Sequence, residues 1–482
     1  MKKLEVSGVL AQKVWDQLNK TAVPIVEAQD FFNLKETIGN LNDRISTNQY
    51  FPDNVHGYFG INKRYGVTRF IPIINHTDMA LYYQVCGEIG DRVIKNKEGI
   101  FGGWRVVPTP ATLGNLNGLS REEQVELLYE NEYFSETFSS AAWFQNYKSF
   151  TDCIRELTLS GEYGNYVGMT DIANFYDTID IDRLISKIRD EVPDLIRHTE
   201  VLEVYLRYWN RRLMGYQKSN KGIPQEIITD GSRNLSHFYL QSFDDAIKKY
   251  CKSIGVKYVR WADDMLFFSP SPQRIESCFY EASRILLSDG LNLSAPKTTI
   301  ISRLEFRKYR CLPLLKSIDE KDDDEFNRQV ELLRNAEKRG ERVKHDTAIK
   351  AVLTHLRRNK HLRNKINLKY IEDGFKKHPE VFSSLNDRQL LASIVIFDDP
   401  SSRAEDVKNM INRKSMAGPK AYFLKLIREH STLLRLSGVK KEQMSAMVDE
   451  IKKSSSDSYI LQKFCIPGAL YRLNLLHAKA PM

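Results

Sequence analysis

The sequence has little of what marks secreted, disulfide-bonded or membrane-spanning proteins. Its six cysteines lie far apart and form no C-x-x-C pair, which argues against zinc, against a disulfide framework and for a reducing compartment. Apolar residues never run together for about 18 positions, so we expect no membrane-spanning segment. The basic N-terminus is followed by no unbroken apolar stretch, so we expect no signal peptide and a cytoplasmic protein.

The bulk composition indicates a soluble protein of more than one domain. A length of 482 residues suggests two or three domains, and 42% hydrophobic residues are enough for a sizeable core. The formal net charge of +9 favours a polyanionic partner such as nucleic acid. Many soluble proteins are this basic, so the charge alone does not identify the partner.

The stretch 258–269 organises the chain, because two adjacent acids interrupt an apolar, β-prone run. This pattern predicts two short strands joined by a tight turn that carries Asp263 and Asp264. Adjacent carboxylates cost free energy unless a cation is present. Two divalent metals held about 3.5–4 Å apart by carboxylates are the usual clamp for phosphoryl transfer. Taken alone, however, an Asp-Asp pair in a hairpin is more often a solvated turn.

Partners for this pair lie upstream and downstream in a fixed order. A predicted strand ends at Asp171, a Gly222-Ile223-Pro224-Gln225 loop feeds a long helix that reaches about Lys252, and residues 290–300 form a turn and a strand. The acids are separated by 92 positions (263 − 171), which leaves room for two helices between their strands. The strands can then lie side by side and bring three carboxylates together, as a polymerase palm requires.

Periodicity predicts the remaining elements. Residues 5–48 are mostly helical, residues 65–75 form a hairpin or two short strands, and residues 78–93 form a helix capped by Thr77 or Asp78. Residues 121–139 are expected to form an exposed acidic helix and residues 273–287 an amphipathic one. From about residue 316 the chain becomes helical pieces with basic clusters, predicted at 324–338, 347–358, 387–397, 420–430 and 443–452.

These motifs, in this order, resemble those of the reverse transcriptases over roughly residues 60–312. Asp171-Ile172-Ala173-Asn174-Phe175-Tyr176-Asp177 is similar to the first catalytic motif, and the Gly-Ile-Pro-Gln loop with residues 232–240 is similar to the second. Trp261-Ala262-Asp263-Asp264 is similar to the x-x-Asp-Asp box, and residues 290–300 to the motif after it. Each motif is weak alone, but four in order are specific.

Within that superfamily the chain most resembles the bacterial abortive-infection, defence-associated reverse transcriptases. The reasons are residues 69–73 followed by Asp78 and residues 81–83, and the helical C-terminal region. The resemblance implies an α+β fold of right-hand polymerase fingers and palm, with an antiparallel palm sheet and helices, over residues 1–315, including a helical N-terminal extension. An all-α, HEAT-like domain over residues 316–482 would replace the thumb.

The resemblance also implies roles for individual residues. Asp171 and Asp263 would bind two Mg²⁺ ions (Mn²⁺ being the alternative), helped by the Ile172 carbonyl and by Asp264. Tyr176 would be the aromatic that selects deoxyribose, and Gln225 would position the incoming nucleotide. Lys297 would donate a proton to pyrophosphate, and Arg69 and Lys148 would contact the triphosphate. The alternative for Tyr176 is a core aromatic, and for Lys297 a solvent-facing lysine.

The sequence departs from the family pattern in three places, and two of these departures bear on templating. Trp261 stands where most relatives have Tyr, and the spacing from Gln225 to Ser232 is about two residues longer than usual. Glu226 replaces a glycine that lets the backbone approach the template base pair. The last two changes put ordinary templated copying in doubt.

The leading hypothesis is therefore a Mg²⁺-dependent DNA polymerase of reverse-transcriptase type that acts in antiphage defence, with restricted or no ordinary templating. By resemblance it could be protein-primed or associated with a non-coding RNA. Expected partners are dNTPs, the DNA product, RNA as template or non-coding RNA, and further copies of the chain, with no membrane. The alternatives are a templated reverse transcriptase of a retron or group II intron, and a catalytically silent nucleic-acid-binding scaffold.

Overall fold

The computed structural model describes residues 3–19, 21–23, 33–63, 67–103, 140–213, 220–225 and 230–476. The chain divides into two compact units, the first made of residues 1–19, 26–56 and 72–304 and the second of residues 20–25, 57–71 and 305–482. The division thus falls after residue 304, whereas the sequence-based boundary after residue 315 stays a prediction. Assignment of 57–71 to the second unit is a tertiary feature that the sequence pattern did not indicate.

The centre of the first unit is a five-stranded sheet in the order β3-β5-β6-β4-β7. The β5–β6, β6–β4 and β4–β7 pairs are antiparallel, and only the edge strand β3 pairs in parallel, with β5. Apolar residues alternate or run continuously along these strands, as expected for a sheet buried on one or both faces. The strand bounds are β3 Ile100–Phe101, β4 Tyr166–Thr170, β5 Lys257–Trp261, β6 Asp264–Ser269 and β7 Thr299–Ser302.

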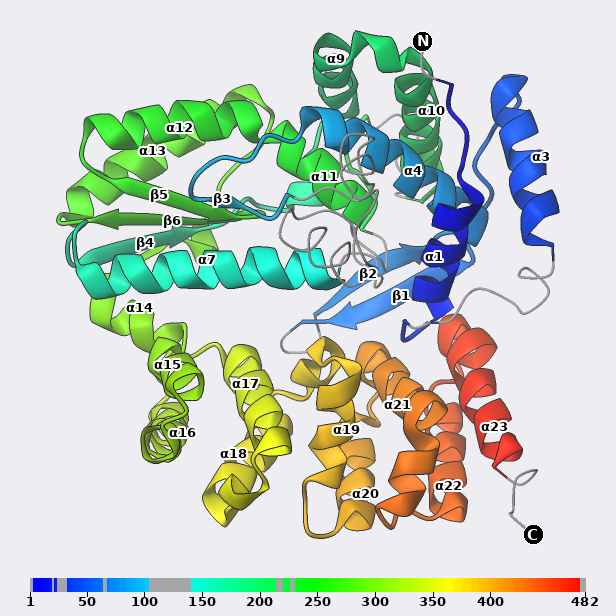
Figure 1. Ribbon diagram of the computed structural model, residues 1–482, viewed down its shortest axis with the longest axis vertical. Helices are drawn as coiled ribbons and strands as arrows, with labels where there is room; N and C mark the ends of the chain where they lie inside the picture. The colour runs from blue at the N-terminus through cyan, green and yellow to red at the C-terminus, as the bar shows by residue number, and fades with distance from the viewer. Residues whose placement is uncertain are drawn as a thin grey trace, which may run out of the picture. The chain divides into compact units, whose positions relative to one another are not determined.

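One face of this sheet is covered by α12 (Gln241–Ser253) and α13 (Pro272–Ser288), drawn in green in Figure 1. Phe267 of β6 packs edge-on against Phe279 of α13 with ring centroids 5.5 Å apart. A Cβ on Gly168 of β4 would lie 2.2 Å from the Ile275 side chain, so only glycine fits there. Side chains alternate between the faces of a strand, so residues an odd number of positions from Gly168 or Phe267 face away from α12 and α13.

The predicted long helix after the Gly-x-Pro-Gln loop is wrong, because the structure has two helices there. α11 (Asp230–Tyr239) packs mainly on α4 (His76–Val93), whereas α12 packs mainly on α13. The apolar faces of α11 and α12 therefore pack on different helices. Leu240 connects α11 to α12, and its side chain is fully buried at the point where the helix is interrupted.

The other predictions in the first unit hold with shifted ends. The described part of residues 5–48 forms the helices α1 and α3, and the amphipathic helix predicted at 273–287 is α13. α4 begins two residues earlier than predicted, because the Asn75 side chain accepts a hydrogen bond from the Thr77 N–H at 2.8 Å and caps the helix. The acidic helix predicted at 121–139 lies outside the described residues. The remaining helices are α1 Gly8–Asn19, α3 Leu34–Ser46, α7 Ser140–Ser160, α8 Phe175–Thr178, α9 Ile181–Glu191 and α10 Ile196–Leu213, with short 3₁₀ turns at Pro193–Leu195 and Ala295–Lys297.

The second unit is mostly helical, and its main helix–helix contacts join each helix to the next one or two along the chain. It also contains most of a two-stranded sheet of β1 (Gly57–Asn62) and β2 (Thr68–Ile73). The strands expected at 65–75 therefore begin at residue 57, earlier than predicted. Its helices, yellow-green to red in Figure 1, are α14 Arg303–Tyr309, α15 Leu312–Glu320, α16 Asp323–Lys338, α17 His345–Arg358, α18 Lys365–Lys377, α19 Asp387–Val395, α20 Pro400–Ile411, α21 Ala417–Leu436, α22 Lys441–Lys453 and α23 Ile466–Leu475. Shorter 3₁₀ or π turns lie at Lys360–Leu362, Pro379–Ser384 and Leu461–Cys465.

All five helices predicted in this region are present, with ends shifted by a few residues. In the part of the chain that the structure describes, no helix combines the length and the apolar character needed to cross a bilayer.

Candidate active site

Three carboxylates meet at one edge of the first unit's sheet. Thr170 of β4 pairs with Met265 of β6, so the next step of the register sets Asp171 beside Asp264. Asp263 lies in the turn between β5 and β6, where Trp261 pairs with Asp264. Asp171 and Asp264 are each three positions from a residue that faces α12 and α13, so both lie on the opposite face. The hairpin predicted from the Asp-Asp stretch and its approach to Asp171 are thus present.

The electrostatics of this cluster favour a cation. Burial, together with the charges of Asp264 and Asp171, raises the pKa of the Asp263 carboxyl to about 6. A shift in this direction means that the folded protein resists placing the third negative charge. Carboxylate and carbonyl oxygens are the ligands that Mg²⁺ prefers, so the donor set fits that ion.

The Ile172 carbonyl is directed toward the same edge. Ile172 forms an antiparallel bridge with Leu293, and that bridge uses the N–H groups of the flanking Ala173 and Ser294, at 2.8 and 2.7 Å. In such a bridge the carbonyl of the central residue points to the other side of its strand. For Ile172 that is the β6 side, where Asp263 and Asp264 lie.

Lys297 lies at the end of a 3₁₀ turn before β7, and its ammonium group forms an ion pair with Asp171. Burial alone would lower the pKa of Lys297, but the hydrogen bond to Asp171 and the charges of Asp171, Asp263 and Asp264 outweigh it, so the pKa is raised. The Lys297 side chain is 63% exposed, whereas that of Asp171 is 7% exposed. The lysine therefore reaches the cluster from solvent and can also turn away from it.

A buried ion pair that the sequence analysis missed supports the Asp-Asp turn. Arg260 and Asp244 are both fully buried and form two hydrogen bonds, from Nε to Oδ1 at 2.8 Å and from Nη2 to Oδ2 at 2.5 Å. Arg260 also donates from Nη1 to the Ala262 carbonyl at 2.5 Å. Ala262 has a φ of 50°, a left-handed conformation that is costly for an L-residue. The sequence could have indicated this ion pair, because Arg260 lies inside an apolar strand and Asp244 on the apolar face of a helix.

Trp261, beside the Asp-Asp pair, lies in an aromatic cluster with α7. Its ring is 5.3 Å from that of Tyr147 and 5.5 Å from that of Phe150. Lys148 is exposed and lies on the side of α7 away from these contacts, as helical spacing requires. The contact of Lys148 with a triphosphate stays a prediction.

The predicted nucleotide-binding residues Tyr176 and Gln225 belong to two segments that lie side by side. The N–H of Ile223 donates to the Tyr176 carbonyl at 2.9 Å, and the N–H of Gly222 donates to the Ile179 carbonyl at 2.8 Å. Both predicted side chains are partly exposed. Their roles remain predictions, and Glu226 lies outside the described residues.

The loop of residues 220–225 is also held by a contact with Ser232, which in turn contacts Tyr82. The Ser232 hydroxyl donates to the Pro224 carbonyl and lies 2.7 Å from the Tyr82 hydroxyl. Arg69 is exposed on β2 and belongs to the second unit, so it is assigned no position relative to the carboxylates.

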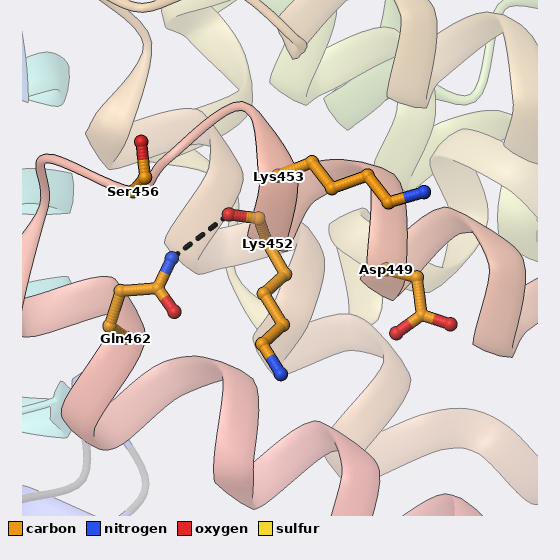
Figure 2. A pocket seen from close by; sticks show the side chains of 5 residues that line it. All are labelled: Asp449, Lys452, Lys453, Ser456 and Gln462. Carbon is orange, nitrogen blue, oxygen red and sulfur yellow. Dashed lines mark hydrogen bonds between the residues drawn. The ribbon is translucent and has the colours of Figure 1, made fainter.

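An open surface pocket in the second unit offers no comparable chemistry. Figure 2 shows its lining, in which the Gln462 amide donates to the Lys452 carbonyl at 2.9 Å. One acid beside two lysines provides no carboxylate pair to hold a metal. The lining residues are Asp449, Lys452, Lys453, Ser456 and Gln462.

Comparison with known proteins points in the same direction as the geometry. Residues 96–333 match the family described as reverse transcriptase (RNA-dependent DNA polymerase). The retron Ec83 reverse transcriptase of Escherichia coli is 26% identical over 102 residues, which are 21% of this chain and 31% of that protein. The alignment thus spans about a third of that relative.

Solved structures similar to this chain include two telomerases. Apo telomerase from Candida tropicalis is 10% identical, with a TM-score of 0.28, over 98% of this chain and 82% of its own. Telomerase from Candida albicans in complex with the TWJ fragment of telomeric RNA is 11% identical, with a TM-score of 0.27, over 92% of this chain and 79% of its own. Scores this low carry no argument about this chain.

Proposed function

Because this chain belongs to the reverse transcriptase superfamily, with its family match over residues 96–333, we propose that its aspartate cluster catalyses metal-dependent DNA synthesis from deoxynucleoside triphosphates. The observation on which this proposal depends is the convergence of Asp171, Asp263 and Asp264 at one sheet edge. The cluster and the Ile172 carbonyl would hold Mg²⁺, or Mn²⁺ in its place. The bound metal would offset the negative charge of the triphosphate and of the attacking oxygen.

Other side chains near the carboxylates would act on the nucleotide. Lys297 would donate a proton to the departing pyrophosphate, since its ammonium group already lies against Asp171. Tyr176 would exclude a ribose 2′-hydroxyl, and Gln225 would position the incoming nucleotide. The docking of the loop 220–225 on the Tyr176 segment supports placing both at one nucleotide. Arg69 and Lys148 remain proposed triphosphate contacts.

For the wider role, we propose antiphage defence by DNA synthesis with restricted or no ordinary templating. Support comes from the resemblance of residues 69–83 to defence-associated relatives and from glutamate at position 226 in place of glycine. The helices of the second unit contact mainly their near neighbours in sequence, as in helical repeat proteins, which supports a HEAT-like domain. RNA and further copies of the chain are the proposed partners.

A second candidate is a templated reverse transcriptase of a retroelement. The similarity to a retron reverse transcriptase favours it, although the match covers only 21% of this chain. The two candidates share the chemistry and differ in the template.

A polymerisation assay on the purified full-length chain separates them. The protein is incubated with Mg²⁺ and each dNTP in turn, with and without a primer–template, and the Asp263→Asn protein is the control. Long products from one or a few dNTPs without added template would support the defence polymerase. Products only on a primer–template with all four dNTPs would favour the retroelement enzyme. No product from the wild type, with nucleic acid still bound, would overturn both in favour of a scaffold.

The same Asp263→Asn change tests the role in cells. Protection against phage should be lost if DNA synthesis is the defence activity. Unchanged protection by the variant, at equal protein levels, would contradict the proposal.

A further inference from the structure

Three helix ends in the second unit bring a carboxylate and two imidazoles together. Glu337 lies in the last turn of α16, His345 is the first residue of α17 and His378 directly follows α18. One ligand atom from each of these side chains lies within 4.8 Å of the other two. α16 and α17 both pack on α18, so the convergence belongs to the packing of this unit.

The Glu337 carboxylate is in a place that favours a bound cation. Its side chain is only 5% exposed, and its Oε1 accepts no hydrogen bond from the residues that the structure describes. An acid in the last turn of a helix also faces the negative end of the helix dipole. The Lys377 ammonium forms an ion pair with Oε1 at 3.4 Å, and His378 Nε2 lies 3.7 Å from the same oxygen. Burying a carboxylate under these conditions is costly unless a cation contacts it.

His378 lies between two carboxylates, one toward each ring nitrogen. Nε2 is 3.7 Å from Glu337 Oε1, and Nδ1 is 3.6 Å from Glu380 Oε1. Both distances exceed a normal hydrogen bond. Metal-binding histidines commonly donate from one nitrogen to a carboxylate, which frees the other nitrogen for the metal. Glu380 is placed to accept that hydrogen bond, with Nε2 directed toward Glu337.

His345 supplies the third donor. It is 7% exposed, and its ring stacks on that of His378 with centroids 4.7 Å apart and an interplanar angle of 15°. The two stacked rings therefore each bring a ring nitrogen to the neighbourhood of the Glu337 carboxylate.

We propose that Glu337, His345 and His378 bind a divalent transition metal of the zinc class, with Glu380 positioning His378 and water completing the coordination. Two imidazole nitrogens and one carboxylate oxygen suit zinc, whereas the all-oxygen aspartate cluster suits magnesium. With bonds of about 2.0–2.2 Å, the donors must come to within about 3.3–3.5 Å of one another, which side-chain rotation at the helix ends can supply.

Such an ion would join the ends of three consecutive helices. The cysteine pattern, which argued against zinc, did not bear on a site built from histidine and glutamate.

The test uses the full-length, metal-free protein in millimolar Mg²⁺, and carries Asp263→Asn in every sample to weaken zinc binding at the aspartate cluster. Zn²⁺ is titrated by calorimetry, and Co²⁺ is added separately to read the coordination geometry from its absorption. We expect one Zn²⁺ per chain and a tetrahedral Co²⁺ spectrum. His345→Gln and His378→Gln should each lower the Zn²⁺ affinity at least about tenfold, and Glu380→Gln should lower it by about 10- to 100-fold.

Two further variants keep the proposal falsifiable if a ligand substitution disturbs folding. His361→Gln is the matched control, because His361 is 66% exposed and pairs with Asp323 at 2.9 Å in the same unit; it should leave the affinity unchanged. Lys377→Gln removes the cation that competes for Glu337 and keeps all three ligands, so it should raise the affinity. No bound Zn²⁺, an octahedral Co²⁺ spectrum, or loss of the ion in His361→Gln would overturn the proposal.

Discussion

The Lys297 ammonium group forms an ion pair with the carboxylate of Asp171, the residue that directly follows β4. The pair joins the strand that carries one candidate metal ligand to the turn that precedes β7. The carboxylate that would bind a metal is therefore neutralised by a lysine when no metal is bound. The lysine and the metal compete for one group, and this competition can be measured.

Replacing Lys297 by methionine should separate metal binding from turnover. Without the ammonium group, the aspartate cluster keeps more negative charge, so the Mg²⁺ concentration for half-maximal activity should fall. Turnover should fall by about 100-fold or more, because the proposed proton donor is lost. Steady-state polymerisation at varied Mg²⁺ measures both effects, with Lys297→Arg as the charge-preserving control. Unchanged turnover in Lys297→Met would assign Lys297 a purely electrostatic role.

The features that were predicted from the sequence depend on local patterns. A strand pattern that ends in Asp171 and another interrupted by Asp263 and Asp264 suffice to predict the hairpin and the meeting of the strands. The buried ion pair of Arg260 and Asp244 was missed, because a charged residue in an apolar segment does not identify its partner.

Tertiary contacts decided the other differences. The break at Leu240 follows from packing on two different helices, and the position of β1 and β2 in the second unit follows from contacts with segments far along the chain, such as α21. Neither contact leaves a periodic signal in the sequence. The Glu337, His345 and His378 cluster was missed for the same reason, since its members come from three separate helices.

The buried ion pair behind the Asp-Asp turn should be sensitive to loss of one partner. Asp244→Asn leaves the buried Arg260 charge without its carboxylate, so the free energy of unfolding should fall by about 3–5 kcal/mol. Asp245→Asn is the matched control, since Asp245 is 67% exposed and its ion pair with Lys97 should contribute about 1 kcal/mol or less. Urea unfolding of the variants measures both changes. Equal effects of the two substitutions would show that burial of the pair does not matter.

Buried Asp78 should make stability depend on pH. Burial raises the pKa of Asp78 to about 7, although hydrogen bonds from the Asp53 N–H at 2.6 Å and the Tyr50 hydroxyl at 2.9 Å act in the opposite direction. Between about pH 4 and pH 7 the folded protein holds a proton that the unfolded chain releases, so stability falls as pH rises through this window. The fall should be on the order of a few kcal/mol.

Urea unfolding of the wild type at several pH values tests the Asp78 prediction. Asp78→Asn should reduce the slope and leave the smaller contribution of Asp263, whose pKa is also raised, to about 6, whereas Asp43→Asn at an exposed position should keep the full slope. An unchanged slope in Asp78→Asn would assign the dependence to another group.

Gly102 is expected to control the position of the Asp-Asp turn. Its φ of 97° is unfavourable for any L-residue, and an added Cβ would lie 2.8 Å from the backbone nitrogen of Ala262. Gly102→Ala should therefore lower the free energy of unfolding by about 1–3 kcal/mol. Because Ala262 directly precedes Asp263, polymerisation should also fall under conditions where the variant is fully folded. In the same unit, Gly39→Ala is the control, since its Cβ meets nothing within 4 Å and helix α3 should gain about 0.5–1 kcal/mol. Thermal unfolding measures the change in stability of both variants, and a polymerisation assay measures their activity. Full activity in Gly102→Ala would show that the turn tolerates displacement.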